Sequence, residues 1–258
     1  MYYPLQIPYI LNQAYADHMQ YQETPAAECS GFVLCFWEMH SVTKYAAAVR
    51  NIVVSDACID IVADYKNQVI GFSGMSRTEF NYTFSLPAYF IGARLMPGAF
   101  HQLTGLPAAA AMDRFLPFGE VCQDFDQSLF FALPFEQAKR YLMEYMAKMT
   151  RAKVPDPMTA LFHLLADQSV TTAAGLYQLM HFSPRQCQRL FDKHYGITPK
   201  MALCIVRFQK CLELLTSPKA LPGDVRDISS YYDQAHFIKD FKRNLGITPL
   251  ELIRHYQT

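Results

Sequence analysis

The chain reads RLFDKHYGITP over residues 189–199 and KDFKRNLGITP over residues 239–249, so one short segment occurs twice. Phe191 corresponds to Phe241 in this repeat, and Gly196 corresponds to Gly246. Internal repeats mark repeated structural units and therefore constrain the architecture before single residues are interpreted. The repeated unit is basic and ends at a glycine, a common stop signal for a helix. We therefore expect two copies of one helical unit in the C-terminal half.

The first copy carries signals for both ends of a helix. Ser183, Pro184 and Gln186 are spaced as an N-cap, a first-turn proline and a capping-box partner. Gly196 is suited to the left-handed conformation that ends a helix, and Thr198 followed by a proline predicts the next start. The residues at helical spacing on one mostly apolar face are Cys187, Leu190, Phe191 and His194.

The second copy repeats this design. Asp233 is a candidate cap at the helix start, and Gly246 is a candidate stop. Thr248 and Glu251 predict a capping box for a last helix. The expected buried stripe consists of Phe237, Phe241 and Leu245. The polar residues expected on or beside the outer faces are Gln234, His236, Lys239, Lys242 and Arg243.

A shorter helical stretch and a brief turn precede each repeated helix. The turns are expected at His181 and Phe182 in the first copy and at residues 230–232 in the second. This order is that of the helix-turn-helix motif, whose second helix enters the major groove of DNA. The sequence therefore predicts two such motifs, at about residues 171–195 and 224–245.

Residues 198 to about 216 join the two motifs and predict one long helix. Its apolar residues are spaced for burial on both neighbours: Met201, Ala202, Ile205, Phe208, Leu212 and Leu215. At ~1.5 Å per residue the helix would be about 28 Å long. That reach is close to the ~34 Å between successive major grooves on one face of B-DNA. A spacer of this kind would let one chain read two grooves.

Residues from about 155 to 258 resemble the AraC/XylS family of transcription regulators. The stretch YYDQAHFIKDFKRNLGITP, residues 231–249, is similar to that family's signature almost throughout. The departures lie at positions where the family usually has glycine or a small residue: His181, Ser230, Tyr177 and Arg226. The resemblance implies sequence-specific DNA binding through both motifs. It implies base contacts from Arg185, Gln188 and Arg189 in the first motif and from Gln234, Ala235 and Lys239 in the second.

The distribution of charge agrees with a polyanionic partner for the C-terminal half. The candidate phosphate contacts are Lys193, Lys200, Lys242 and Arg243. Residues 1–134 hold 6 Lys and Arg against 12 Asp and Glu, whereas residues 135–258 hold 17 against 11. The halves therefore carry net charges of −6 and +6, although the whole chain is neutral. A solvated helix face is the alternative for a single basic run, and the duplicated placement argues against it.

Composition and cysteine usage define the broad class of protein. A chain of 258 residues with 51% hydrophobic and 18% charged residues fits two globular domains. It contains no uncharged apolar run of about 18 residues and no basic-then-apolar leader, so we expect no membrane span and a cytoplasmic location. The seven cysteines lack zinc-site spacing and are expected to be reduced. We assign no metal, because His18, His40 and His101 are scattered, and no cofactor.

The N-terminal half has the pattern of a β-rich fold. Segments rich in β-branched and aromatic residues alternate with turn-forming residues, at 31–37, 52–54, 58–62, 69–72, 80–84 and 89–94. This pattern predicts a barrel or sandwich and, with the helical half, an α+β fold class. Residues 93–100, followed by the apolar helix-like stretch 106–112, resemble the cupin-like sensing domain of a subset of the AraC/XylS family.

The expected domain organisation has three parts. Residues 1–134 form the β-rich sensing domain, and residues 157–258 form the DNA-binding domain. Between them, residues 135–156 are interpreted as a linker with a candidate dimerisation helix and a hinge at 151–157.

A sensing domain acts by binding a ligand with different affinity in two states of the protein. The candidate effector pocket consists of Trp37, Phe72, Tyr82, Phe84, Tyr89 and Arg94. Packing in the core is the alternative for each aromatic residue. The expected partners are double-stranded DNA and a small-molecule effector, with RNA polymerase and a second copy of the chain as further candidates and no membrane.

No catalytic residues are predicted, so the chain is not expected to be an enzyme. Asp56, Asp60 and Asp64 share one strand face, where solvated carboxylates or an acid at a turn are the common case. Residues 71–74 lack the spacing of a nucleophile elbow. No local cation would lower the pKa of Cys58, so a structural role is favoured for it. The alternative function left open is a ligand-binding or enzymatic β domain with a helical protein-interaction module.

Overall fold

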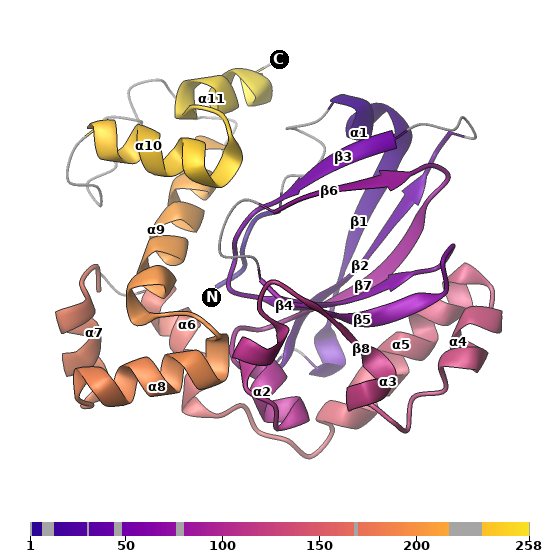
Figure 1. Ribbon diagram of the computed structural model, residues 1–258, viewed down its shortest axis with the longest axis horizontal. Coiled ribbons are helices and arrows are strands. Elements are labelled where there is room, and N and C mark those ends of the chain that lie inside the picture. The colour runs from indigo at the N-terminus through magenta and orange to yellow at the C-terminus, as the bar shows by residue number, and fades with distance from the viewer. Residues whose placement is uncertain are drawn as a thin grey trace.

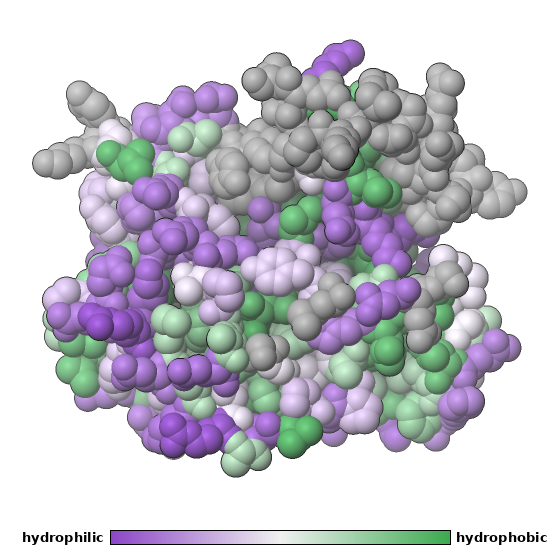
Figure 2. All heavy atoms as spheres, turned by 180° about the vertical axis from the view of Figure 1, so that it is seen from behind, coloured by the Kyte–Doolittle hydropathy of each residue, from purple (hydrophilic) through white to green (hydrophobic). Residues whose placement is uncertain are grey.

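A computed structural model describes residues 2–6, 13–29, 31–43, 48–75, 80–167, 170–216 and 234–257 of the chain. Figure 1 shows a β-rich half, with helices along one side of it, beside an all-helical half. This arrangement confirms the expected α+β class. Hydrophilic and hydrophobic residues are mixed over the face shown in Figure 2. None of the helices in the described part combines the length and apolar character needed to cross a bilayer.

Two antiparallel sheets form the β-rich half. The larger sheet has the order β1-β2-β7-β4-β5-β8, and β3 pairs with β6 in the smaller one. The strands of the larger sheet are β1 (Met19–Pro25), β2 (Val33–Ser41), β4 (Ile59–Asp64), β5 (Val69–Ser73), β7 (Tyr89–Leu95) and β8 (Phe115–Pro117). The smaller sheet consists of β3 (Ala48–Val53) and β6 (Phe80–Ser85), and α1 (Gln13–His18) contacts β3.

Strand alternation gives the larger sheet two different faces. In β4, Ile59 and Ile61 lie in the main core, whereas Asp60 and Val62 point to the opposite side. Helices cover the core side: α2 (Ala99–Thr104), α3 (Phe118–Val121), α4 (Gln127–Ala132) and α5 (Phe135–Thr150). The opposite side faces β3 and lines a partly open cavity, described below.

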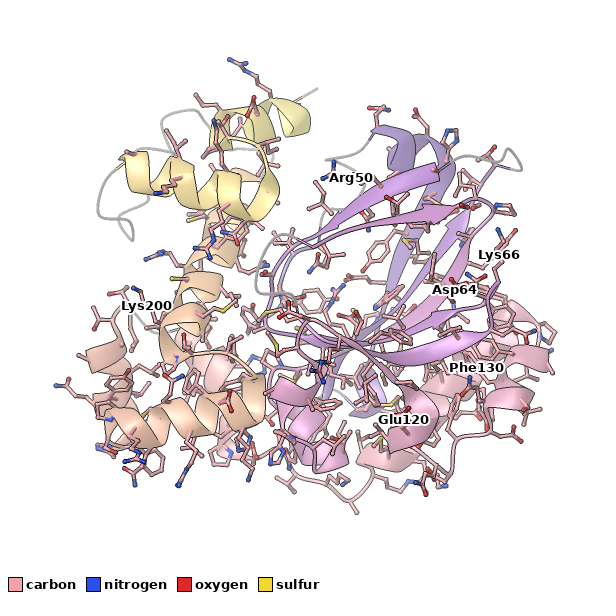
Figure 3. The ribbon with its side chains drawn as sticks, viewed as in Figure 1. Arg50, Asp64, Lys66, Glu120, Phe130 and Lys200 are labelled. Atoms are coloured by element: carbon pink, nitrogen blue, oxygen red, sulfur yellow. The ribbon has the colours of Figure 1, made fainter. Side chains whose placement is uncertain are left out.

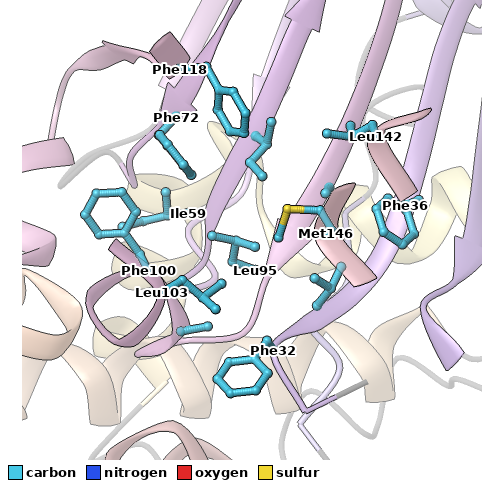
Figure 4. Packing of buried hydrophobic residues seen from close by; sticks show 14 of the residues in the cluster. Phe32, Phe36, Ile59, Phe72, Leu95, Phe100, Leu103, Phe118, Leu142 and Met146 are labelled. Carbon is cyan, nitrogen blue, oxygen red and sulfur yellow. The ribbon is translucent and has the colours of Figure 1, made fainter. Parts of the chain in front are cut away.

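Aromatic rings fill the core between the sheet and these helices (Figure 4). The ring of Phe72 lies 5.1 Å from that of Phe100 and 5.0 Å from that of Phe118. Two short 3-10 helices border this region, η1 (Ala27–Cys29) and η2 (Ala108–Ala111). The stretch 106–112 was expected to be helix-like. Only its central residues, those of η2, are helical, and they form a 3-10 helix.

Helix α5, which follows the predicted boundary at residue 134, packs on the sheet of the N-terminal half. Its apolar side, Ala138, Leu142 and Met146, is fully buried in the core beneath the sheet. The sheet needs a covering layer on its apolar face, and α5 supplies it. The domain therefore continues to Thr150, and only the exposed residues 151–155 remain as a connection to the helical half.

The C-terminal half confirms the predicted order of helices. It consists of α6 (Pro157–Asp167), α7 (Ala173–Met180), α8 (Pro184–Tyr195), α9 (Pro199–Leu215), α10 (Gln234–Leu245) and α11 (Pro249–Gln257). The first helix and turn expected for the second motif, with Asp224, Arg226, Ser230 and Asp233, lie outside the described residues. The long predicted connector is α9, with a length of about 25 Å.

The predicted helix ends at Ser183, Gly196 and Gly246 are confirmed. The Ser183 N–H donates to Gln186 Oε1 at 3.0 Å, and the Gln186 N–H donates to Ser183 Oγ at 3.4 Å. Gly196 and Gly246 adopt the left-handed conformation with φ of 69° and 73°. His181 also has a positive φ, 54°, at the turn of the first motif, so it takes the conformation for which glycine is usual.

Candidate nucleic-acid interface and enclosed cavity

Helix α8 presents one polar side to solvent. Cys187 and Phe191 are fully buried, and this stripe turns Arg185, Gln188 and Arg189 outward, where all three are exposed. The predicted faces of the first repeated helix are therefore correct. These side chains are long and rich in donors, and they come from the N-terminal part of the helix, which reads base edges in helix-turn-helix proteins.

Helix α10 repeats this arrangement. Phe237 and Phe241 are buried, whereas Ala235 and Lys239 are exposed. The cations Lys242 and Arg243 are also exposed, near the C-terminal end of the helix. Gln234 is the first residue of α10, and its side chain lies outside the described residues, as does that of His236.

Helix α9 holds the two repeated helices apart. Ala202 and Ile205 pack in the core of the first motif, and Phe208 and Leu212 pack in the core of the second. The Phe208 ring lies 5.3 Å from that of Phe241 in α10. Figure 1 shows α8 and α10 across opposite ends of α9. A helix buried on both sides in this way is a stiff spacer.

The candidate phosphate contacts occupy two settings. Lys193 and Lys242 are exposed on α8 and α10. Lys200 of the connector helix α9 (Figure 3) and Arg243 of α10 line one recess of about 240 Å³, together with Ser55 of the N-terminal domain. The recess therefore places a cation of α9 and a cation of α10 beside the N-terminal domain.

The C-terminal end of α8 packs against the N-terminal domain. The ring of His194 lies 4.7 Å from that of His101 in α2, in an edge-to-face arrangement. His194 is buried, and burial lowers its pKa below the usual value, although Asp156, with Oδ2 3.7 Å from Nδ1, acts in the opposite direction. This contact leaves the N-terminal part of α8 free.

A cavity of about 440 Å³ lies on the inner side of the larger sheet. Of the six predicted pocket residues, Trp37 and Arg94 line it. Phe72 does not, because alternation along β5 turns it into the helix-covered core. Tyr89 is 40% exposed and its ring packs against Phe135 of α5 instead.

Phe84 is not among the described residues that line the cavity. Phe84 packs edge-on against Phe90, with ring centroids 5.4 Å apart, and Phe90 lines the cavity. The side chain of Tyr82 lies outside the described residues.

A buried network of charged groups forms one wall of this cavity. Arg94 donates to Glu23 Oε1 at 2.9 Å and to the Tyr21 hydroxyl at 3.2 Å. Its Nε lies 3.7 Å from Asp56 Oδ2 and 3.6 Å from Asp60 Oδ1. Asp56 also accepts hydrogen bonds from the Cys58 N–H and the Gln6 side chain, at 2.9 and 2.8 Å.

This network corrects the expectation of solvated strand carboxylates. Asp56 is 4% exposed, and Asp60 Oδ1 accepts a hydrogen bond of 2.8 Å from the indole N–H of Trp37. Asp64 behaves as expected for an acid at a turn, because its carboxylate accepts from the Asn67 N–H and side chain. The sequence pattern correctly placed the three carboxylates on one face, but it did not predict the cavity in front of them.

Burial dominates the protonation of groups at this wall. Burial, together with neighbouring Asp56, raises the pKa of Asp60 to about 7, and Arg94 and the Trp37 hydrogen bond oppose this shift. Burial also raises the pKa of the Cys58 thiol well above its usual value. Cys58 is therefore an unreactive thiol, as a structural role requires.

No group of three or more His, Cys, Asp or Glu side chains within the described ranges is placed to hold a metal ion. The pocket residues missed by sequence reasoning include the carboxylates and Tyr21 of β1, a strand whose polar sequence gave little signal.

Two family models match the chain. Residues 176–255, from α7 to α11, match a family described as Helix-turn-helix domain. Residues 21–117, from β1 to β8, match a family described as Domain of unknown function (DUF6597). No curated protein matches the chain at a significant level.

The similar solved structures include several of ToxT from Vibrio cholerae. One has 11% sequence identity and a TM-score of 0.41, and the match covers 93% of this chain and 100% of that chain. ToxT bound to an unsaturated fatty acid has 10% identity, 81% and 87% coverage and a TM-score of 0.38. ToxT bound to (E)-4-(8-methylnaphthalen-1-yl)but-3-enoic acid has 10% identity, 93% and 100% coverage and a TM-score of 0.40. At these scores the likeness says nothing about the ligands of this chain.

Proposed function

We propose that this chain, which carries an AraC-type helix-turn-helix domain in its C-terminal region, is a sequence-specific transcription regulator that responds to a small-molecule effector. One observation carries the DNA-binding part. Two helices with the same sequence pattern, α8 and α10, are fixed at opposite ends of α9 and present basic and amide side chains to solvent.

The roles of these side chains follow from their chemistry. Arg donates bidentately to guanine and Gln pairs with adenine, so we assign base contacts to Arg185, Gln188 and Arg189 on α8. On α10 we assign base contacts to Gln234, Ala235 and Lys239, where alanine would offer a methyl contact to thymine. Phosphate contacts are assigned to Lys193, Lys200, Lys242 and Arg243.

The effector part of the proposal rests on how the cavity meets the DNA-binding domain. Val54 lines the cavity and also packs in the core of the second motif, beside Phe208 and Phe241. The next residue, Ser55, lines the cavity too, and its carbonyl oxygen accepts from the side chain of Gln209 in α9 at 3.2 Å. One short segment is therefore shared between the cavity wall and the connector helix.

The N-terminal segment 2–6 provides a second link. The Tyr2 N–H donates to His163 Nδ1 of α6 at 2.8 Å, and the Tyr2 hydroxyl donates to the Asp56 carbonyl at 2.7 Å. The Leu5 N–H donates to Gln209 Oε1 at 2.8 Å. A ligand that moves Asp56 would therefore act on contacts to α6 and α9, and it would shift the protein between two arrangements by its different affinity for them.

Protein partners complete the proposal. A DNA-bound regulator acts on RNA polymerase, which is the partner that this function implies. A second copy of the chain is a further candidate partner, and α5 is the candidate dimerisation helix. The exposed side of α5 is polar and carries Glu136, Arg140 and Glu144. Association through α5 would therefore weaken as salt rises, which light scattering at two salt concentrations tests. The proposal assigns no catalytic step to the chain.

The test of the function is a gel shift of the full chain with random-sequence DNA over a salt series. We expect affinity to fall steeply with salt, because each neutralised phosphate releases counterions. Lys242→Ala should weaken binding on every sequence, whereas Lys66→Ala, an exposed cation of the N-terminal domain (Figure 3), should not. Absence of salt-sensitive binding would favour the alternative, a helical protein-interaction module.

A further inference from the structure

The cavity has an aromatic wall. Trp37, Tyr21, Phe90 and Phe115 line it, and the rings of Tyr21 and Trp37 lie 6.3 Å apart. A volume of about 440 Å³ falls in the range of ~300–1,000 Å³ that is usual for small-molecule sites. Aromatic faces carry negative potential and attract cations, most strongly when water is excluded.

The charged groups of the lining are mostly negative. Asp56, Asp60 and Asp64 line the cavity, and Arg94 is the one Lys or Arg side chain that lines it within the described residues. Arg94 is already paired, because Glu23 accepts from one terminal nitrogen and two aspartates lie near its Nε. An anionic ligand would therefore meet carboxylates, whereas a cationic ligand would relieve their repulsion.

Two polar atoms at this wall have unused hydrogen-bonding capacity. The Nε of Arg94 is buried, its side chain is 6% exposed, and it has no hydrogen-bond partner in the described part of the chain. Asp60 uses Oδ1 for Trp37, and its second oxygen makes no hydrogen bond within that part. The Arg94 Nε is enclosed between Asp56 and Asp60, whereas the Asp60 side chain is 22% exposed, so its second oxygen indicates a place for a positively charged group of a ligand.

We propose that this cavity binds an organic cation, a molecule with an apolar body and a single ammonium group that lies against Asp60 and the Trp37 ring. This inference rests on the proposed function, in which the cavity holds the effector. The apolar body contacts Phe90 and Phe115. Specificity arises because a neutral or anionic analogue leaves the carboxylates uncompensated.

Three probes of matched shape test this inference. They are benzyltrimethylammonium, its uncharged isostere neopentylbenzene, and the anion phenylmethanesulfonate, which have the same number of non-hydrogen atoms. Trp37 is the only tryptophan of the chain, so its fluorescence reports binding in the full protein, and calorimetry provides an independent measure. We expect the cation to bind about tenfold more tightly than either analogue. Equal binding of the three probes, or tighter binding of the anion, would overturn the proposal.

Matched carboxylate variants locate the site. Asp60→Asn keeps an oxygen for the Trp37 indole and should reduce the advantage of the cation to less than about threefold. Glu120→Gln neutralises an exposed carboxylate on α3 (Figure 3) and should leave the affinity of the cation unchanged. If Asp60→Asn fails to fold, Phe90→Leu serves in its place, because it removes an aromatic face and should weaken the cation more than the uncharged isostere. Full cation preference in the folded variant would contradict the assignment.

The two proposals fail in distinguishable ways. Loss of DNA binding with preserved cation preference would reject the regulator and retain the site. Salt-sensitive DNA binding without cation preference would reject this ligand class and retain the regulator.

Discussion

The side-chain amide of Gln209 donates a hydrogen bond to the carbonyl oxygen of Ser55 over 3.2 Å, and so joins the connector helix α9 to the cavity wall. Its amide oxygen accepts from the Leu5 N–H at 2.8 Å, and the side chain is 5% exposed. Both ends of one buried amide are therefore used between the domains. A movement of the cavity wall would therefore be transmitted through this contact to α9, the helix that separates the two motifs.

Gln209→Leu should destabilise the protein by about 1–3 kcal/mol, because it removes two part-buried hydrogen bonds, one to the Leu5 N–H and one to the Ser55 carbonyl. Chemical unfolding measures this change. Gln178→Leu, at an exposed position on α7, should stay within about 0.5 kcal/mol. The same Gln209 variant should reduce the effect of benzyltrimethylammonium on DNA affinity. An unchanged effect would place the coupling elsewhere.

Substitutions on α8 and α10 should separate base reading from charge. Arg185→Ala or Gln188→Ala should lose about 1–3 kcal/mol for the preferred base at one half-site and relax that preference. Lys242→Ala should weaken all sequences alike and lower the salt slope by about 1. Competitive gel shifts with single-base operator variants measure both effects. Equal losses on every sequence for all three variants would contradict these roles.

Phe191→Ala and Phe241→Ala should act through folding. Both rings are fully buried, so each truncation should cost about 3–5 kcal/mol. Thermal unfolding is the measurement, and Phe182→Ala, at an exposed ring in the first turn, is a matched control expected to change little. A Phe241→Ala variant with wild-type melting and no DNA binding would mean that the ring contacts DNA.

Acid should weaken the contact between α2 and α8 through His194. Burial lowers its pKa in the folded protein, so the unfolded chain binds more protons as the pH falls below about 6.5. Stability should therefore be full above that pH and decrease below it. Thermal unfolding at pH 7.5 and at pH 5.5, about one unit above and below the ordinary histidine pKa, measures this loss of stability. His194→Gln should lose the part of the decrease that is due to this ring.

Cation binding should strengthen as the pH rises through about 7, where the folded protein ionises Asp60. The charged groups that act on it are Arg94, Asp56 and Glu23. Because its pKa is raised on folding, Asp60 itself destabilises the fold at alkaline pH, and a bound ammonium group offsets this cost. Fluorescence titrations of benzyltrimethylammonium across this pH range measure the trend. A flat profile in wild type, or an unchanged slope in Asp60→Asn, would argue against Asp60 as the ionising group.

The sequence predicted the helical half well because helix caps and buried stripes depend on residues only three or four positions apart. Ser183 with Gln186, and Thr248 with Glu251, form the capping boxes that their spacing indicates. The buried stripes of α8 and α10 follow from the 3.6-residue period alone. The sequence-specific roles of the outer side chains remain predictions.

The N-terminal half was less predictable because its cavity is formed by residues that are far apart in the sequence. Alternation placed Asp56, Asp60 and Asp64 on one face, but nothing local tells whether such a face meets solvent or a cavity. The same limit applies to Phe72, whose side depends on which face the helices cover. The apolar stripe of α5 indicated burial without indicating its partner, which is the domain's own sheet.

The stiffness of α9 has an evolutionary consequence. A single inserted residue would rotate α10 by about 100° relative to α8 and displace it by ~1.5 Å along the helix axis. Small insertions would therefore turn α10 away from its groove and would not adapt the protein to a wider operator. Changes in target preference are therefore expected to arise by substitution of the few outward side chains of α8 and α10. The distance between the two DNA elements that one chain recognises is expected to stay constant during evolution.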